Sequence, residues 1–322
     1  MTKIAVLDDW QGIAATATDW SPITRQAEVT FFRHSFVNAD ALVAALSSYD
    51  VVLAMRERSA FPKAVIERLP NLRLLSFTGP RNASVDVDAC TARGITVCNT
   101  VGSAYSHATA ELALGLLLAA ARNLALGDAE IRAGRFQENT TPGLELHGAT
   151  LGLIGLGRIG ADMARYGQAL GMKVLAWSQN LTEERASEFN ATRVAKDELM
   201  ARSDAISLHL VLSDRSRGII GAADIARMKP GAILVNTSRA GLVDSAALLE
   251  AVQSGRIVAA LDVYDQEPLP PDHPLRSAPN TVLTPHLGYV ARDNMEAFYA
   301  LSVENIAAWL AGKPIRVVNP AA

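Results

Sequence analysis

Three loops in the second half of the chain carry side chains whose types suit acid–base chemistry. Arg239 comes just past the buried strand pattern "ILVNT", and His286 follows the pattern "TVLTP". Asp262 directly follows a third pattern, "IVAAL", and Glu267 lies in the loop beyond it. The carboxyl ends of parallel strands meet at one edge of an open sheet, and ligands bind in the crevice there. We therefore expect the three loops to line one site.

These residue types fit the binding of a carboxylate and the transfer of a proton. An arginine can hold a carboxylate through two hydrogen bonds, and a histidine can move a proton near neutral pH. A carboxylate bonded to that histidine orients the ring and favours its charged form. Taken singly, Arg239 also fits a surface salt bridge, Glu267 a solvated loop, and His286 a structural group. Their joint placement favours catalysis.

The stretch "LGLIGLGRIG" supplies a glycine turn of the kind that binds dinucleotides. The strand pattern "TLGLIG" runs into Gly155-x-Gly157-x-x-Gly160, and an amphipathic helix pattern follows. The first glycine allows the turn, the second lets the backbone approach a pyrophosphate, and the third lets helix and strand pack closely. The start of the helix, at Arg158 and Ile159, then holds the anion. We expect a dinucleotide cofactor here.

The acid that usually follows the second strand of such a site is missing. It bonds the adenosine ribose of NAD, but here the strand pattern "KVLAW" is followed by Ser178. A serine can bond the ribose without repelling a 2′-phosphate. The sequence therefore leaves NAD and NADP both open. Cys90 and Cys98 lack metal-site spacing, and no metal is expected.

Composition and charge describe an ordinary globular protein. The chain has 322 residues, a net charge of −3 and 49% apolar residues. There is no stripe of lysine and arginine, so no nucleic-acid partner is expected. The most apolar stretch, residues 112–121, is too short to span a bilayer and lies within a predicted helix of residues 106–126. The N-terminus shows no signal pattern, so we expect a cytoplasmic protein without a membrane partner.

Strand and helix patterns alternate twice along the chain. One series occupies residues 1 to about 100, and a second begins at Thr150 with the glycine turn. Such alternation predicts parallel sheets covered by helices. We expect two open parallel-sheet α/β domains.

The order of the motifs and the residues within them resemble those of the D-isomer-specific 2-hydroxyacid dehydrogenases over nearly the whole chain. The resemblance is carried by "NLRLLSFTGPRNASVDVDACTARGITVCNT", "ATAELALGLLLAAAR", "LGLIGLGRIG", "HLVLSDRSRGIIGAADIARMKPGAILVNTSRAGLVD", "LDVYDQEPLP" and "LTPHLG". It implies a Rossmann dinucleotide-binding domain, residues 101–287, inserted into a flavodoxin-like substrate domain of residues 1–100 and 288–322. It also implies a homodimer formed through the dinucleotide-binding domain.

The resemblance assigns roles to individual residues. Arg239 is expected to bind substrate, His286 to be the catalytic histidine, and Glu267 to be its acid partner. Asp262 is expected to contact the nicotinamide carboxamide. The residues expected to bind the cofactor are Thr109, Gly155, Gly157, Arg158, Ile159, Gly160, Ser178, Thr237, Ser238, Asp262 and Gly288.

One loop departs from the family pattern. The substrate-binding loop reads "TGPRNASVD", in which Gly79 is present and Arg81 replaces a usual glycine. Pro80 cannot donate a hydrogen bond from its backbone. We expect Gly79, Arg81 and Arg239 to contact the substrate, with Arg81 adding positive charge.

These features predict an NAD(P)-dependent oxidoreductase that interconverts a 2-oxo acid and a D-2-hydroxy acid. The alternative is a co-repressor-like interaction protein that senses the dinucleotide on the same fold. A third possibility, formate oxidation, is disfavoured because relatives with that activity have glutamine in place of Glu267. The sequence does not name the 2-oxo acid.

Overall fold

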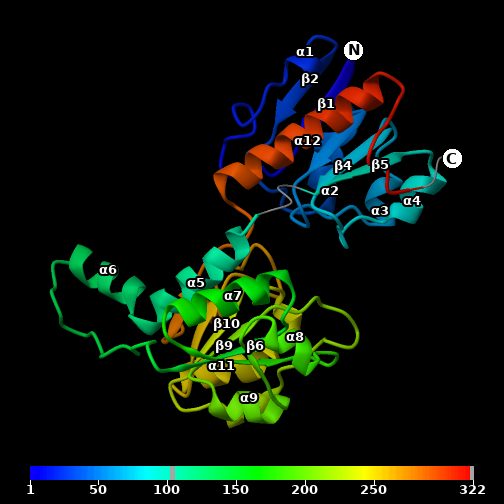
Figure 1. Cartoon of the computed structure of the whole chain (residues 1–322). Helices are drawn as coiled ribbons and strands as arrows, with labels where there is room; N and C mark the ends of the chain where they lie inside the picture. Colours follow the sequence, from blue (N-terminus) through cyan, green and yellow to red (C-terminus); the bar gives the residue numbers. More distant parts are fainter. Residues whose placement is uncertain (102–105, 320–322) are drawn as a thin grey trace. The chain divides into compact units, whose positions relative to one another are not determined.

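The computed structural model describes residues 1–101 and 106–319. The chain divides into two compact units, which we call unit 1 (Met1–Ser106 with Val290–Ala322) and unit 2 (His107–Tyr289) (Figure 1). The expected domain boundaries, after residues 100 and 287, fall a few residues before these. Each unit has its own parallel sheet.

Unit 1 is built on five parallel strands in the order β2-β1-β3-β4-β5. This is the order of flavodoxin-like sheets. The inner strands are continuous apolar runs because helices cover both faces. The strands are β1 (Thr2–Val6), β2 (Ala27–Phe31), β3 (Val51–Ala54), β4 (Leu74–Thr78) and β5 (Thr96–Thr100).

Two helices of unit 1 start at residues whose side chains cap them. The side chain of Asn38 accepts a hydrogen bond from the Ala41 amide at the start of α2, and Asp86 does the same for Ala89 in α4. The last helix, α12, comes from the far end of the chain and packs against β4 and β5 (Figure 1). The helices are α1 (Ser21–Thr24), α2 (Ala39–Leu46), α3 (Lys63–Ile66), α4 (Val87–Ala92) and α12 (Arg292–Leu310).

Unit 2 holds seven parallel strands in the order β12-β11-β10-β9-β6-β7-β8. The chain leaves β6 toward β7 on one side and returns to β9 on the other, so the switch point of the sheet lies at the carboxyl end of β6. The two-residue strand β8 was not predicted. The strands are β6 (Thr150–Ile154), β7 (Lys173–Trp177), β8 (Thr192–Arg193), β9 (Ala205–Leu208), β10 (Ile233–Asn236), β11 (Val258–Leu261) and β12 (Thr281–Leu283).

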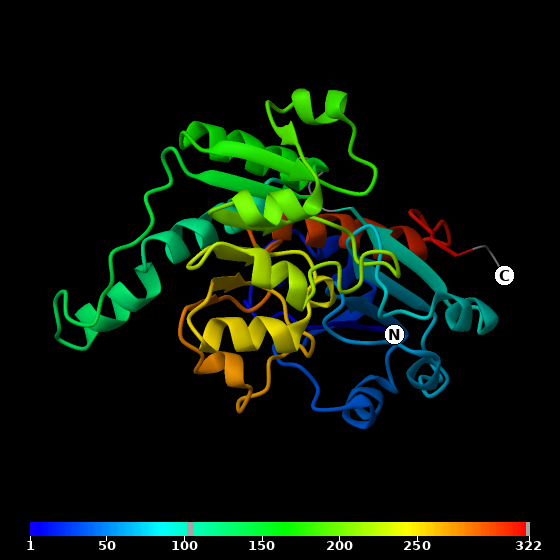
Figure 2. The same ribbon diagram turned by 90° about the horizontal axis from the view of Figure 1, so that it is seen from below.

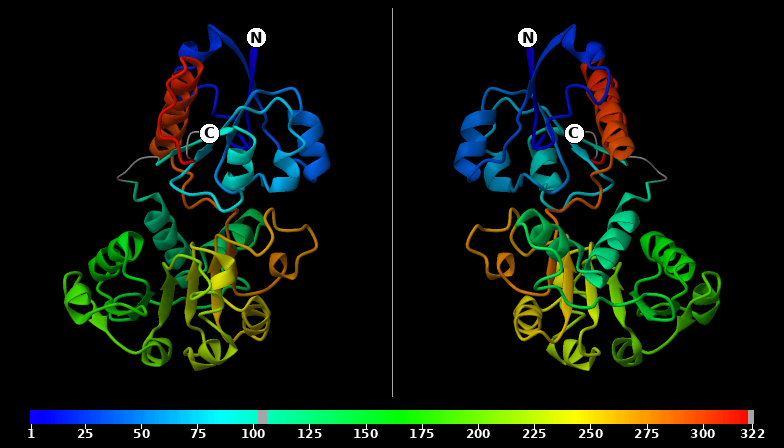
Figure 3. Two further views of the ribbon diagram at one scale, coloured as in Figure 1. Left: turned by 90° about the vertical axis from the view of Figure 1, so that its right-hand side faces the viewer. Right: turned by 90° about the vertical axis from the view of Figure 1, so that its left-hand side faces the viewer.

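Two helical layers cover the sheet of unit 2 (Figure 3). One layer contains α5 and α7 and buries an apolar cluster against β6, β7 and β10; the other contains α9, α10 and α11 and buries a second cluster. Both faces of the sheet are therefore buried under apolar side chains. The helices are α5 (Ala108–Ala121), α6 (Leu124–Arg132), α7 (Arg158–Ala169), α8 (Glu183–Ser187), α9 (Lys196–Arg202), α10 (Ala222–Arg227) and α11 (Ser245–Gln253), with short 3₁₀ turns η1 (Ala240–Leu242) and η2 (Pro274–Arg276).

The single helix predicted over residues 106–126 is wrong. The chain breaks at Asn123, whose backbone is left-handed (φ 52°), and α6 leaves α5 at an angle of 64°. Asparagine adopts this conformation more readily than most residues. Its side chain also donates to the Thr141 carbonyl at 2.9 Å, a contact that helix periodicity does not reveal. As a result α6 stands away from the sheet (Figures 1 and 2).

Among the described residues, no single helix is long and apolar enough to cross a membrane. Helices α5 and α6 meet that length and composition only when they are counted together across their bend.

Candidate active site at the strand ends of unit 2

The glycine turn after β6 is shaped by backbone contacts that exclude side chains. Gly155 has φ +101°, and a Cβ there would lie 2.6 Å from the His209 carbonyl oxygen. A Cβ on Gly160 would lie 2.1 Å from the Gly155 oxygen. Gly157 differs, because no atom lies within 4 Å of a Cβ built there. The first and third glycines therefore serve packing, and the second leaves open space beside the backbone.

That open space lies at the start of α7. Gly157 is the N-cap of this twelve-residue helix, and both Gly157 and Arg158 are exposed. The amides of a first helical turn have no partner within the helix, and the helix dipole favours an anion beside them. The turn can therefore hold a phosphate group.

His286 and Glu267 form a bonded pair in the loops after β12 and β11. The imidazole Nδ1 lies 2.5 Å from Glu267 Oε2, and Glu267 Oε1 accepts the Tyr264 amide at 2.9 Å. Burial by itself raises the pKa of Glu267, but the hydrogen bond and charge of His286 outweigh it and bring that pKa below the ordinary value. The carboxylate is thus ionised and fixed at both oxygens. Because Nδ1 faces Glu267, Nε2 is the nitrogen left for a substrate.

Asp262 fixes the loop that carries His286. Its fully buried carboxylate accepts hydrogen bonds from Thr284 Oγ1 at 2.6 Å, the Leu287 amide at 2.7 Å and the Gly288 amide at 2.8 Å. Burial raises the pKa of Asp262 despite these bonds. Thr109 Oγ1 donates to the Gly288 carbonyl at 2.8 Å from the other side. Asp262, Thr109 and Gly288, all predicted to bind cofactor, are therefore also the braces of the His286 loop.

Arg239 stands on a loop that is held by side chains at the ends of β9 and β10. The side chain of Asn236 donates from Nδ2 to the Arg239 carbonyl at 3.0 Å, and its Oδ1 accepts from the backbone amide of Ser238 at 3.0 Å. Ser238 Oγ donates to the Leu208 carbonyl at 2.7 Å. The charge of Arg239 also helps to lower the pKa of Glu267. Unit 2 thus brings Arg239, Glu267 and His286 together at one edge of its sheet.

A sequence model of the D-isomer specific 2-hydroxyacid dehydrogenases, for their NAD binding domain, matches residues 114–288. This is more than half of the chain. The chain belongs to the D-isomer-specific 2-hydroxyacid dehydrogenase family. Residues 114–288, nearly all of unit 2, form the NAD-binding domain of this family.

Individual relatives agree with this assignment. The chain is 36% identical to D-3-phosphoglycerate dehydrogenase of Archaeoglobus fulgidus over 87% of its own length and 53% of that protein. It is 38% identical to glyoxylate reductase of Aeropyrum pernix over 79% of this chain and 78% of that protein. A solved phosphoglycerate oxidoreductase from Vibrio cholerae matches 97% of this chain and 100% of that one, with a TM-score of 0.91 and 37% identity. The chain spans about half the length of the Archaeoglobus relative.

Unpaired polar atoms at the strand ends of unit 2 fit a bound dinucleotide. Thr237 Oγ1 is buried without a hydrogen-bond partner among the described residues, and so are both ring nitrogens of His209. Burial lowers the pKa of His209 to about 4, so its imidazole is neutral. His209 directly follows β9, the neighbour of β6, and contacts the glycine turn at Gly155, while Thr237 directly follows β10, the next strand along the sheet. Buried polar atoms of this kind normally have partners, and a bound cofactor would supply them.

Ser178 lies directly after β7, as its strand pattern predicts. It is half-buried, and its hydroxyl has no hydrogen bond within the described residues. Arg185, a few residues on, pairs with Glu188 and lies over the Phe189 ring at 4.4 Å. The position after β7 thus carries no acid, and the nearby Arg185 is already paired with Glu188.

The predicted substrate loop belongs to unit 1. Gly79 follows β4 with φ +97°, and a Cβ there would lie 1.7 Å from a guanidinium nitrogen of Arg56. Arg81 is exposed. Sequence reasoning missed Arg56, although it follows β3 at the same edge of the sheet as Gly79. A rule that inspects every strand end would have found it.

Sequence reasoning also missed three residues that support the site in unit 2. His209 and Thr284 directly follow β9 and β12, and the strand-end rule would have found both. Tyr264 supports Glu267 through a backbone amide, which leaves no side-chain signal. Within the described ranges, no three His, Cys, Asp or Glu side chains gather to hold a metal ion.

The three glycines predict separable effects. Gly157→Ala should leave the melting temperature of the free protein unchanged, because its Cβ meets open space, but should raise the NADH dissociation constant about tenfold or more. Gly160→Ala should lower the melting temperature, because its Cβ overlaps the Gly155 oxygen. Calorimetric titration and thermal unfolding measure both. Gly115→Ala in α5, also in open space, is the control; equal NADH binding by the Gly157 and Gly115 variants would contradict the assignment.

Proposed function

We propose that this chain reduces a small 2-oxo acid to the D-2-hydroxy acid with NADH or NADPH, and catalyses the reverse oxidation. The observation that carries the proposal is the His286–Glu267 pair beside Arg239 at the strand ends of an NAD-binding domain. Its relatives are named for several such reactions, including glyoxylate reductase and D-3-phosphoglycerate dehydrogenase.

The three side chains divide the chemistry. The guanidinium of Arg239 binds the substrate carboxylate through paired hydrogen bonds and polarises the adjacent carbonyl. A nicotinamide bound beside these residues would supply the hydride for the carbonyl carbon. His286 donates the proton from Nε2 to the oxygen, while Nδ1 remains on Glu267. In oxidation His286 takes the proton back, so the pair works in both directions.

The residues that would hold the cofactor come from five strand ends. The glycine turn and the start of α7 bind the pyrophosphate, and Ser178 bonds the adenosine ribose. Thr237, Ser238 and the Asp262–Gly288 brace lie toward the nicotinamide. In unit 1, Gly79 and Arg81 belong to the loop that we propose binds the substrate.

The co-repressor alternative requires no proton donor. A sensor would keep the glycine turn, but it would have no use for a carboxylate fixed at both oxygens against a histidine. Turnover of any 2-oxo acid separates the two functions. We take the intact pair as support for an enzyme.

We further propose that the protein is a cytoplasmic homodimer joined through α6 and the segment after it. Leu124, Ile131 and Phe136 are 55%, 54% and 75% exposed there. Large apolar side chains on an element that leaves its own sheet need a cover. A second copy of the same surface would supply it.

His286→Ala should remove nearly all 2-oxo acid reduction. General acid–base catalysis contributes roughly 10²–10⁴-fold, so the variant should retain about a hundredth of the rate or less. Steady-state reduction of glyoxylate at pH 7 measures the rate, and calorimetry confirms that NADH still binds. His147→Ala, at an exposed histidine elsewhere in unit 2, should be unaffected. More than a tenth of the wild-type rate in the His286 variant would exclude it as the proton donor.

Glu267→Gln should shift the pH profile of reduction. Reduction needs the charged imidazole, and the ionised Glu267 stabilises that charge. Without it the rate should fall off at a lower pH than in the wild type. Profiles of kcat/KM from pH 5 to 9 test this, with Glu250→Gln at an exposed residue of α11 as control. Superimposable profiles would place Glu267 outside the catalytic pair.

Ser178→Asp should move cofactor preference toward NADH. The wild type should accept NADPH at least as well as NADH, because Ser178 carries no charge to repel a 2′-phosphate. The measurement is kcat/KM for both cofactors at low ionic strength, where screening is weak. Ser187→Asp adds the same charge on α8 and should change nothing. A wild type that strongly prefers NADH, with no response to Ser178→Asp, would show that Ser178 does not face the ribose.

Ile131→Asp combined with Phe136→Ser should convert the dimer to a monomer. A charge and a lost aromatic ring on α6 and its continuation remove the apolar area that the second copy would cover. Analytical ultracentrifugation measures the mass. Val37→Asp, at an exposed apolar residue of unit 1, is the control. A double variant that sediments as the wild type does would rule out this surface.

A further inference from the structure

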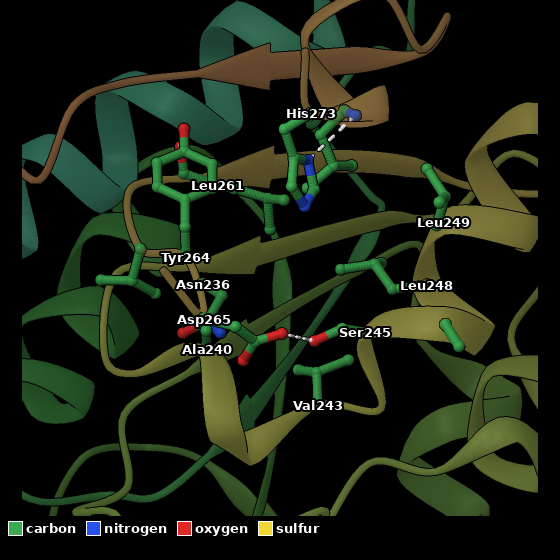
Figure 4. Close-up of a pocket in the computed structure, with 13 residues that line it drawn as sticks. Asn236, Ala240, Val243, Ser245, Leu248, Leu249, Leu261, Tyr264, Asp265 and His273 are labelled. Carbon is green, nitrogen blue, oxygen red and sulfur yellow. Dashed lines mark hydrogen bonds between the residues drawn. The ribbon is translucent and has the colours of Figure 1, made fainter. Parts of the chain in front are cut away.

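A cavity of about 210 Å³ lies within unit 2 behind the loop that carries Arg239 (Figure 4). Its walls are α11, the carboxyl ends of β10 and β11, and the turn at η2. None of Arg239, Glu267 and His286 lines it, and neither does the glycine turn. The cavity is therefore separate from the proposed active site, although it shares the loops that build it.

The walls of the cavity are mostly apolar. They are formed by Val243, Leu248, Leu249, Leu261, Val263 and Leu275. A dry cavity of about 150 Å³ with comparable walls holds a benzene molecule. The cavity is thus large enough for one aromatic ring or a branched alkyl group with a short substituent.

The polar rim is acidic. Asp265 is exposed at the mouth, where Ser245 Oγ donates to one of its oxygens, and it has no cationic partner among the described residues. The nearby Asp244 is already occupied, since it caps α11 through the Ala246 and Ala247 amides. His273 accepts the Leu275 amide at Nδ1 and presents the rest of its ring to the cavity (Figure 4). Among the described residues that line the cavity, Asp265 is thus the carboxylate with which a cationic ligand could pair.

We propose that this cavity binds a small primary amine with an apolar body, whose ammonium group pairs with Asp265. The apolar body would lie against the leucines of α11 and β11. A carboxylate on the same ligand would meet Asp265 with the wrong sign, and a neutral alcohol would gain no ionic contact.

An occupant would touch the residues that position the catalytic groups. Asn236 lines the cavity and holds both the Arg239 carbonyl and the Ser238 amide. Tyr264 also lines it, and its amide is bonded to Glu267. A ligand in contact with both walls therefore alters the placement of Arg239 and Glu267 and reduces their joint fit to the substrate. This coupling rests on the proposed function, whereas the binding itself does not.

Calorimetry with three probes of one shape tests the binding. Benzylamine should bind at least tenfold more tightly than benzyl alcohol at low ionic strength, and benzoate should not bind. Asp265→Asn, which keeps a partner for Ser245, should abolish the preference for the amine. Ala246→Phe, at a cavity-lining position of α11, should fill the space and remove binding of both. Asp272→Asn, an exposed acid in the same loop, should leave all three affinities unchanged.

Some results would overturn the site. These are no benzylamine binding by the folded wild type, equal binding of amine and alcohol, or benzylamine binding that survives Ala246→Phe. Because Asp265→Asn changes only one exposed group, it decides the ionic part even if the filled variant unfolds.

Kinetics tests the coupling separately. Saturating benzylamine should lower kcat/KM for glyoxylate at least threefold in the wild type and not in Asp265→Asn at the same concentration. Unchanged kcat/KM with confirmed binding would disprove the coupling alone. If no 2-oxo acid is turned over, the proposed function fails, while the calorimetric result still decides the cavity.

Discussion

The proposed active site depends on one buried carboxylate. Asp262 directly follows β11, and its three accepted hydrogen bonds fasten the loop after β12 to the edge of the sheet. His286 sits in that loop with a left-handed backbone (φ 55°), a conformation that needs support in a non-glycine residue. A buried carboxylate with fewer donors would be costly. The same bonds that satisfy Asp262 therefore fix the histidine.

Glu267 extends this arrangement to the next loop. One oxygen of Glu267 accepts from the Tyr264 amide, and the other is bonded to the His286 ring. The loops after β11 and β12 are therefore connected by two side chains, Asp262 and Glu267. The loop that Asn236 holds places the charge of Arg239 close enough to Glu267 to lower the pKa of that carboxyl group. The result is a set of charged groups whose positions follow from backbone hydrogen bonds in a rigid parallel sheet. Such preorganisation is what catalysis by charge stabilisation requires.

The two sides of the β10 and β11 loops have different surroundings. One side carries Arg239, Glu267 and the buried unpaired hydroxyl of Thr237, which suits a charged cofactor and substrate. The other side is the apolar cavity beneath Asn236 and Tyr264. A ligand in the apolar cavity and a substrate on the charged side would therefore contact the same loops, and a few hydrogen bonds would link the two binding sites.

Much of the local structure follows from the sequence because its causes are short-range. The strands are continuous apolar runs, the caps at Asn38 and Asp86 act within one helical turn, and Gly155 to Gly160 lie within six residues. The parallel-sheet rule then places Arg239 and His286 at one edge. For these features the residue types and their spacing were sufficient.

Other features came only from the tertiary structure, since they depend on residues far apart in the chain. The helix break at Asn123 involves Thr141, and the bracing by Asp262 involves Leu287 and Gly288. The unpaired imidazole of His209 became visible only once its neighbours were placed around it. The sequence alone thus determined which groups stand at the strand ends. Long-range hydrogen bonds and burial decided which of them brace the loops and which remain available to a ligand.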